Sequence, residues 1–139
     1  MKTVKVAVIG TGSISDSHLQ SYTRNPGAEL IAVCDLNAER ARKKAEQFGA
    51  AKSYSNYKEL LADPDIDAVS ICTWNNTHAE IAIAALRAGK HVLVEKPVST
   101  TVEEALRIQE AVRETGKLLM VGYVRRYDPN AQMLRKFVE

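Results

Sequence analysis

The sequence predicts a three-layer α/β domain: a doubly wound parallel sheet with helices on both faces. Two observations predict it. Apolar runs of strand length alternate with segments of helical periodicity along the chain, and these runs are apolar almost throughout, as strands covered on both faces must be. A length of 139 residues is enough for one domain with a single core.

The first expected strand, Val4–Ile9, is rich in β-branched residues and is ended by Gly10. Each later strand is expected where a similar apolar run stands between two helical segments. These runs are Leu30–Cys34, a weaker candidate around Lys52–Tyr54, Ala68–Cys72, His91–Val94 and Leu118–Val121. Because helical segments separate the runs, the strands are expected to be parallel.

The segments between strands carry helix signals: apolar residues three or four positions apart, a capping residue before them, and glycine or proline after them. The helices expected are Ala38–Phe48, Tyr57–Ala62, one opening at a capping box Thr77–Glu80 and one opening at a capping box Thr101–Glu104. Their inward residues are expected to include Ile81, Ala84, Ala85 and Ala88 in the third helix and Val102, Ala105, Leu106 and Val112 in the fourth.

The last segment has a different pattern. Asp128-Pro129 caps a helix that carries Met133, Leu134, Phe137 and Val138 on one stripe. We expect residues 1–122 to form the domain, and residues 123–139 to be a connector and the start of a helix that crosses toward a second domain. A terminal helix packed on its own sheet is the alternative.

Composition excludes several classes of partner. The net charge of +2 offers no basic excess for a nucleic acid. No apolar run approaches the roughly 18 residues of a membrane span, and the chain enters its first strand without a leader, so we expect a cytoplasmic protein that does not contact a membrane. Cys34 and Cys72 lie in apolar runs and are expected as buried thiols, with no disulfide and no metal site.

Residues 10–15, with the sequence GTGSIS, lie between the first strand and a helix, which is the context that gives a glycine-rich turn its meaning. Gly10 permits the tight turn, and Gly12 lets the backbone approach a pyrophosphate. Amides around Ser13 and Ile14, at the positive end of the helix dipole, would hold the phosphates. This pattern is typical of a Rossmann-type dinucleotide-binding domain.

Asp35 is expected at the end of the second strand. A carboxylate there accepts hydrogen bonds from the adenine ribose 2′- and 3′-hydroxyls and repels a 2′-phosphate, so NAD is favoured over NADP. Arg40 is close enough in sequence to reach a phosphate, which keeps NADP as the second candidate. The alternative role of Asp35, a helix cap, is weaker because Asn37 already fits that position.

Two more polar segments, Thr73–His78 and Glu95–Pro97, each follow a strand. Ligands of an open parallel sheet lie beyond the carboxyl ends of its strands, so both segments are expected to edge the same crevice as the glycine turn. Glu95 and Lys96 point to opposite sides of an extended chain and are not expected to pair with each other. His78, in the first turn of a helix, is expected either to form a hydrogen bond as a neutral imidazole or to be structural.

Over essentially its whole length the sequence resembles the N-terminal half of the glucose–fructose oxidoreductase / inositol dehydrogenase / rhizopine-catabolism (Gfo/Idh/MocA) family. The glycine turn is shared by many nucleotide-binding folds, whereas the Glu-Lys-Pro triplet in this context is far more specific. The segments that carry the resemblance are Val8–Ile14 with His18, Cys34-Asp35, Thr73, Asn75 and His78, Ala88–Val92, Glu95-Lys96-Pro97, and Tyr123 with Arg126, Tyr127 and Pro129.

The resemblance implies NAD(P)-dependent oxidation or reduction at a carbon that bears a hydroxyl, in sugars, inositols or their derivatives. It implies that Lys96 is catalytic, beside the nicotinamide and hydrogen-bonded to the reacting oxygen, and that Glu95 helps to hold the nicotinamide end. Trp74 and Ser15 depart from the proline and the third glycine usual in the family. The residues expected to bind the cofactor are Gly10, Thr11, Gly12, Ser13, Ile14, Asp35, Thr73, Trp74, Asn75, His78, Glu95 and Lys96.

Family enzymes carry a second α/β domain that covers the crevice and contributes acid/base residues. We therefore expect this chain alone to bind NAD with little or no dehydrogenase activity on a sugar or polyol. The alternative is a free-standing, non-catalytic nucleotide-binding or redox-sensing module. A homo-oligomer formed through the Met133–Val138 stripe and a sheet edge is a further hypothesis.

Overall fold

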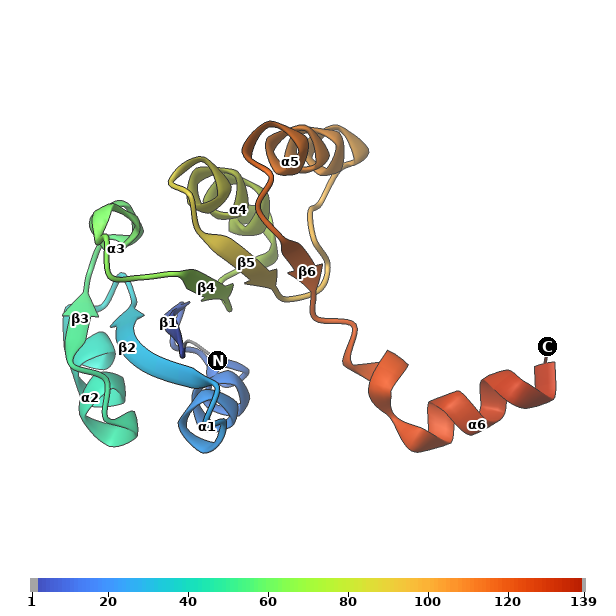
Figure 1. Cartoon of the computed structure of the whole chain (residues 1–139), viewed down its shortest axis with the longest axis horizontal. Coiled ribbons are helices and arrows are strands. Elements are labelled where there is room, and N and C mark those ends of the chain that lie inside the picture. The colour runs from blue at the N-terminus through green and yellow to red at the C-terminus, as the bar shows by residue number, and fades with distance from the viewer. Residues whose placement is uncertain (1–2, 139) are drawn as a thin grey trace.

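The structure is a computed structural model that describes residues 3–138. These residues form a parallel six-stranded sheet in the order β3-β2-β1-β4-β5-β6 (Figure 1). The three-layer, doubly wound prediction is confirmed, and strand ends differ from it by at most two residues. The strands are β1 Val4–Ile9, β2 Ala28–Cys34, β3 Lys52–Tyr54, β4 Ala68–Ile71, β5 His91–Val94 and β6 Leu119–Val121.

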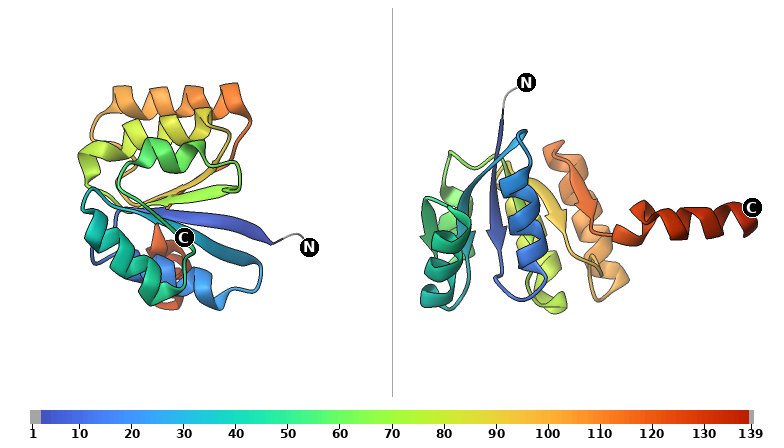
Figure 2. Two further views of the ribbon diagram at one scale, coloured as in Figure 1. Left: turned by 90° about the vertical axis from the view of Figure 1, so that its left-hand side faces the viewer. Right: turned by 90° about the horizontal axis from the view of Figure 1, so that it is seen from below.

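Helices cover both faces of the sheet (Figure 2). One face packs on α1 (Ser15–Arg24) and α2 (Ala38–Phe48), through a core that includes Leu19 and Ala45. The other face packs on α3 (Tyr57–Ala62), α4 (His78–Arg87) and α5 (Val102–Thr115). Short 3₁₀ helices at Asn75–Thr77 and Val124–Tyr127 and a last helix, α6 (Pro129–Val138), complete the described chain.

The strand order reverses at the centre of the sheet. From β1 the chain winds outward through β2 to β3, then returns to β4 on the other side of β1 and winds outward again to β6. The loops that leave β1 and β4 therefore diverge at their carboxyl ends. In sheets of this type, ligands bind in the crevice at that reversal.

The helix that opens near Thr77 is capped differently from the prediction. Thr77 makes no capping bond to a backbone amide of α4, so the predicted Thr77–Glu80 capping box is wrong. Instead, the Thr77 hydroxyl donates to the Trp74 carbonyl at 2.8 Å, within the preceding 3₁₀ turn, and lies 2.7 Å from the Thr73 hydroxyl, which is free to donate to it. The second capping box, between Thr101 and Glu104, is confirmed.

The inward face of α5 also differs from the prediction. Ile108 and Ala111 are its buried residues, whereas Val102 is 77% exposed and Leu106 is 60% exposed. Leu106 lies two positions from Ile108, roughly 200° around the helix, so the two side chains cannot share a face. In α4, Ile81 and Ala85 are buried as predicted, Ala84 is half-buried, and Ala88 is exposed because it lies past the last turn of the helix. The helix is otherwise buried nearly all round because it lies between α3 and α5.

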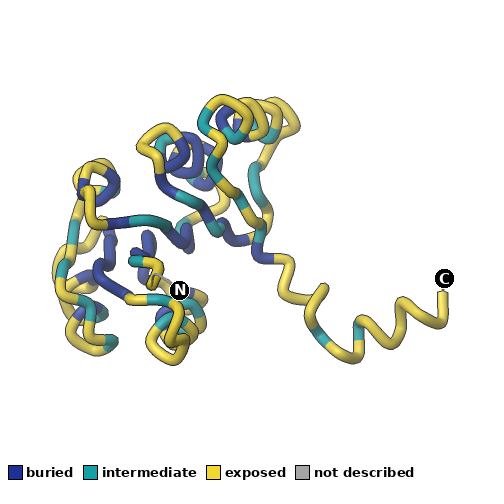
Figure 3. Tube along the Cα trace, viewed as in Figure 1, coloured by how far each residue is buried: buried dark blue, intermediate teal, exposed yellow. Residues whose placement is uncertain are grey.

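The α6 helix stands away from the sheet (Figure 1) and is mostly exposed along its length (Figure 3). None of its described residues is buried, and Phe137 is 80% exposed. It packs mainly against the 3₁₀ helix Val124–Tyr127. The alternative of a terminal helix packed on its own sheet is therefore not what the structure shows. Residues 1, 2 and 139, which the predicted ranges 1–122 and 123–139 include, lie outside the described residues.

Candidate functional site

The glycine turn is pressed against the end of β4. Gly10 has φ +91°, and a Cβ on it would lie 2.6 Å from the carbonyl oxygen of Cys72. The Gly10 amide donates to the Cys34 carbonyl at 2.8 Å, so the turn is also fixed to β2. Only glycine fits this position. A Cβ on Gly12, by contrast, would meet nothing within 4 Å, so the backbone there borders open space.

The first turn of α1 closes the motif. Ser15 is fully buried, and its hydroxyl donates to the Gly12 carbonyl at 2.6 Å. Serine thus keeps the close packing that a third glycine would provide and also fixes the shape of the turn. Ser13 and Ile14 are exposed beside it. The Asp16 carboxylate, in the first turn of α1, pairs with Lys44 of α2, which offsets its negative charge near the turn.

Asp35, at the end of β2, accepts four hydrogen bonds. One oxygen takes the Thr11 amide at 2.9 Å and the Thr11 hydroxyl at 2.6 Å. The other takes the Asn37 amide at 2.9 Å and the Arg40 guanidinium at 2.6 Å. These four donors occupy about as many positions as a carboxylate has lone pairs. Asn37, as expected, is the cap of α2 and accepts from the Arg40 amide at 3.0 Å.

The surroundings of Asp35 keep it ionised. Burial raises the pKa of its carboxyl, but the hydrogen bonds from Arg40, Thr11 and the Asn37 amide outweigh that effect and lower the pKa to about 2. The glycine turn therefore has a buried negative charge fixed to its rim through Thr11. The Arg40 side chain is mainly exposed, so it can leave this cluster without disturbing the backbone.

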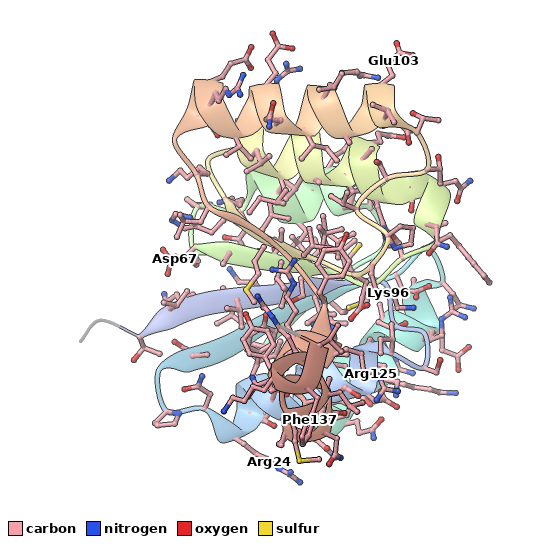
Figure 4. The ribbon with its side chains drawn as sticks, turned by 90° about the vertical axis from the view of Figure 1, so that its right-hand side faces the viewer. Arg24, Asp67, Lys96, Glu103, Arg125 and Phe137 are labelled. Carbon is pink, nitrogen blue, oxygen red and sulfur yellow. The ribbon has the colours of Figure 1, made fainter. Side chains whose placement is uncertain are left out.

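Lys96 and Glu95 lie on opposite sides of the chain, as the sequence predicts: Lys96 is exposed to solvent and Glu95 is buried. Lys96 is exposed and lines a cavity of about 570 Å³ together with the segment Gly122–Arg126. Figure 4 shows Lys96 and Arg125 on the same side of the molecule. Glu95 is buried and pairs with His18, not with Lys96. The cavity lies beyond the ends of β5 and β6.

The remaining predicted residues, in the loop after β4, differ in their exposure to solvent. Trp74 is 83% exposed and Asn75 is exposed, while Thr73 is half-buried. His78 is fully buried, with Nδ1 at 2.7 Å from the Pro97 carbonyl and Nε2 at 3.1 Å from the Thr73 carbonyl. Both ring nitrogens thus face backbone carbonyls. His78 joins the loops after β4 and β5, and its place among the residues expected to bind the cofactor stays a prediction.

His18 is the functional candidate that sequence reasoning missed. It entered only as part of a family motif, without a role. In the structure its Nε2 lies 2.9 Å from Glu95 Oε1, at the junction of α1 with the end of β5. Its place three residues after Ser15, on the face of α1 that turns toward the sheet, is the only signal in the sequence, and it does not identify a partner 77 positions away.

The sequence predictions also concern the cysteines, possible metal ligands and possible membrane-spanning helices. Cys34 and Cys72 are buried free thiols, as predicted, and burial raises the pKa of each to about 12. Within residues 3–138, no group of three His, Cys, Asp or Glu side chains could hold a metal ion. No helix in that part of the chain has the length and apolar character to cross a bilayer.

A strand, a glycine turn, a helix N-terminus and a carboxylate at the end of the neighbouring strand together define a dinucleotide-binding domain. Comparison with known protein families agrees with this class. The chain belongs to the oxidoreductase family with an NAD-binding Rossmann fold, GFO_IDH_MocA, whose model matches residues 4–123. The family resemblance carried by the motifs is thereby confirmed.

Relatives named as inositol dehydrogenases are similar over nearly the whole chain. Inositol 2-dehydrogenase 3 of Saccharopolyspora erythraea is 43% identical over 139 residues, which cover 99% of this chain and 41% of the relative. Inositol 2-dehydrogenase/D-chiro-inositol 3-dehydrogenase of Shouchella clausii is 41% identical over 140 residues, covering 99% of this chain and 40% of the relative. The chain thus spans about two fifths of the length of these relatives.

Solved structures give the same fold with either cofactor. Scyllo-inositol dehydrogenase from Lactobacillus casei, with bound NAD(H) and scyllo-inositol, has a TM-score of 0.91 and 25% identity, covering 99% of this chain and 41% of that one. KijD10, a 3-ketoreductase from Actinomadura kijaniata in complex with TDP-benzene and NADP, has a TM-score of 0.92 and 33% identity, covering 99% and 43%. The choice between NAD and NADP therefore has to be argued from this chain's own residues.

Proposed function

We propose that this chain binds NAD across the carboxyl edge of the sheet. In this proposal the pyrophosphate lies over Gly12 and the helix N-terminus, the adenine ribose lies at Asp35, and the nicotinamide extends toward Lys96. The observation that carries the proposal is the turn itself. Gly10 has no room for a side chain, Gly12 borders open space, and Thr11 holds a buried carboxylate at the rim.

The residues beside Gly12 fit the phosphates. Ser13 and Ile14 are exposed at the start of α1, where backbone amides and the helix dipole favour an anion. Across the opening, Thr73, Trp74 and Asn75 follow β4 and form the opposite rim. We assign these three to the wall of the cofactor cleft, with Trp74 offering its indole to the ribose or the adenine.

Cofactor preference rests on Asp35 and Arg40. The carboxylate is charged at neutral pH, so it attracts the two ribose hydroxyls of NAD and repels the 2′-phosphate of NADP. Arg40 lies 2.6 Å from that carboxylate and neutralises part of its charge. The pair therefore favours NAD but keeps a cation beside the position of the 2′-phosphate.

The reaction proposed for the longer protein is hydride transfer between the nicotinamide and a hydroxyl-bearing carbon of an inositol or similar polyol. The cofactor, when bound, accepts or donates the hydride. Lys96 is exposed at a cavity and carries an amine that can donate a hydrogen bond to the substrate oxygen and stabilise negative charge on it. The substrate class is supported by the names of the relatives, which act on inositols.

Residues 123–139 are proposed as a connector to further polypeptide. The exposed stripe of α6, which includes Met133, Leu134 and Phe137, lacks a cover within residues 3–138, and the relatives carry more than half of their length outside the matched part. We assign substrate selection and the acid/base residues to that additional part. The 139-residue chain is therefore expected to bind cofactor without efficient turnover.

Titration calorimetry with NAD and NADP tests the cofactor site. The Asp35→Ala variant should lose about tenfold to a hundredfold in NAD affinity, because a charge-assisted hydrogen bond contributes about 1.5–3 kcal/mol, and its preference for NAD over NADP should narrow. Glu46→Ala, which removes an exposed carboxylate of α2, is the matched control and should bind NAD as the parent chain does. Unchanged NAD affinity in Asp35→Ala would reject the proposed ribose position.

An absorbance assay for NADH with NAD and myo-inositol tests the second part. We expect binding without turnover from the 139-residue chain. A rate typical of dehydrogenases would contradict the assignment of the acid/base residues to additional polypeptide. A chain that binds NAD but shows no turnover even when joined to that polypeptide would support the non-catalytic module instead.

A further inference from the structure

A line of hydrogen bonds runs beneath the cleft from α1 to the end of β5. The Tyr22 hydroxyl lies 2.6 Å from Ser70 Oγ, Ser70 Oγ lies 3.3 Å from His18 Nδ1, and His18 Nε2 lies 2.9 Å from Glu95 Oε1. One assignment of protons satisfies every link with a neutral imidazole: Tyr22 donates to Ser70, Ser70 donates to Nδ1, and Nε2–H donates to the Glu95 carboxylate.

The order Ser70–His18–Glu95 has the composition of a nucleophilic triad but not its exposure. Ser70 lies in the middle of β4, is fully buried and already contacts Tyr22, so its oxygen cannot reach a substrate. Both Glu95 and His18 are largely buried as well. A buried carboxylate is kept in a fold at a cost in desolvation, which directs attention to what Glu95 holds in place.

Glu95 connects three parts of the site. Its Oε1 accepts from His18 on α1, and its Oε2 accepts from the Lys96 backbone amide at 3.2 Å. On the side of β6, a Cβ on Gly122 would lie 3.2 Å from Oε1, so the carboxylate occupies the space that glycine leaves. Gly122 begins the segment that lines the cavity with Lys96. The carboxylate therefore touches α1, the end of β5 and the end of β6.

We propose that His18 is a positioning residue: through Glu95, it fixes Lys96 relative to the N-terminus of α1. This inference rests on the proposed function, in which α1 holds the pyrophosphate and Lys96 lies beside the nicotinamide. The covalent length of the cofactor fixes the distance between its phosphates and its reactive ring. The hydrogen bond from His18 of α1 to Glu95, the residue before Lys96, holds the phosphate-binding helix and Lys96 at a separation that suits that distance.

Two polar variants separate the two ring nitrogens. In His18→Gln, the side-chain amide reaches the position of Nε2 and keeps a donor for Glu95. In His18→Asn, the amide reaches only the position of Nδ1, so the contact with Ser70 is kept and the one with Glu95 is lost. Ser21→Ala, which removes an exposed hydroxyl from α1, is the control.

The readout is the affinity of the 139-residue chain for two ligands, NADH and ADP-ribose, by titration calorimetry. ADP-ribose carries the adenine, both phosphates and both riboses but no nicotinamide. We expect His18→Asn to lower the affinity for NADH by about tenfold and the affinity for ADP-ribose by no more than about twofold. The hydrogen bond lost is one to a charged carboxylate, which contributes about a factor of ten or more in an equilibrium constant. His18→Gln should stay within about threefold of the parent for both ligands.

Each other outcome overturns something specific. Equal losses for NADH and ADP-ribose in His18→Asn would make His18 a purely structural residue, and NADH binding equal to the parent's would show that Lys96 does not depend on it. A thermal unfolding curve for each variant identifies a general loss of folding. If His18→Asn does not fold, the test falls on His18→Gln, and a ratio of NADH to ADP-ribose affinity in that variant that differs from the parent's by more than about threefold overturns the proposal. If the parent chain binds neither ligand, the proposed function itself fails.

Discussion

The two edges of the sheet both contain buried charged side chains, but they use them differently. Figure 4 shows Asp67 and Lys96 at opposite ends of the strands. At the amino edge, Lys90 is buried and donates to the carbonyls of Asp63 and Ile66, at 2.7 and 2.8 Å. Burial lowers the pKa of its amine. There the charge is enclosed by the loop between α3 and β4.

At the carboxyl edge the charges border open space. Asp35 is as well hydrogen-bonded as Lys90, yet it lies at the rim of a turn where a Cβ on Gly12 would meet nothing within 4 Å. Lys96 faces a cavity directly. The difference teaches that a buried charge alone does not identify a binding site in this fold. The proposed site rests on a buried charge that lies beside an unfilled space.

The largest expected effect comes from the glycine turn. Gly10→Ala places a Cβ 2.6 Å from a backbone oxygen at φ +91°, so we expect the free energy of unfolding to fall by about 3 kcal/mol or more. In Gly12→Ala the new Cβ has room in the unliganded chain, so the free energy of unfolding should change by less than about 1 kcal/mol. The affinity for NAD should still fall. Urea unfolding followed by circular dichroism, with NAD titration, measures both. Equal stability losses in the two variants would contradict the contrast.

Lys90 tests the amino edge. Lys90→Met removes the donor from two buried carbonyls and should lower the free energy of unfolding by about 2–4 kcal/mol, with NAD affinity changed less than twofold. Lys43→Met, at an exposed pair with Glu39, should cost less than about 0.5 kcal/mol. A marked loss of NAD affinity in Lys90→Met would show that the two edges are not independent.

Acid titration tests the charge of Asp35. Its pKa is about 2 in the folded chain against 3.8 in the reference state, so the folded state holds this carboxylate ionised more readily than the unfolded one. The resulting stability is present above about pH 4 and is lost as the pH falls toward 2, on the order of 2 kcal/mol in total. Urea unfolding at several pH values should show a shallower acid loss in Asp35→Asn. The same slope in both chains would mean that Asp35 does not contribute.

The smallest effect concerns a cap near the carboxyl edge. Thr101→Ala removes one half of the capping box of α5 and should lower the free energy of unfolding by about 1 kcal/mol without changing NAD affinity. Thr101→Ser keeps the hydroxyl and should restore most of the stability. A change in NAD affinity in Thr101→Ala would extend the cofactor site beyond the residues named above.

The sequence predicted the elements of the fold well because their signals are local. The apolar run Val4–Ile9, the capping residue Asn37 and the end of the helix Ala38–Phe48 each depend on signals within a few positions, and the structure has them as expected. The error in the inward face of α5 arose because apolar residues were counted without their angle around the helix. Leu106 is apolar, but it lies on the side of α5 that faces away from Ile108.

The candidate site was predictable to the extent that its residues share the end of a strand. Asp35 and Lys96 were expected at one edge of the sheet because parallel strands bring their carboxyl ends together. The bond between His18 and Glu95 could not be foreseen, since it joins distant positions through side-chain packing alone. His78 was expected in the first turn of a helix, where the structure has it, but no local pattern indicates that both ring nitrogens face backbone carbonyls.

Because Asp35 already accepts four hydrogen bonds, cofactor binding has to exchange one of these donors for the ribose. Since four donors already surround the carboxylate, a ribose diol gains its place there by displacing a resident guanidinium from a helix surface. Replacing that one surface arginine would shift the balance between the two nicotinamide dinucleotides while leaving every residue of the core as it is.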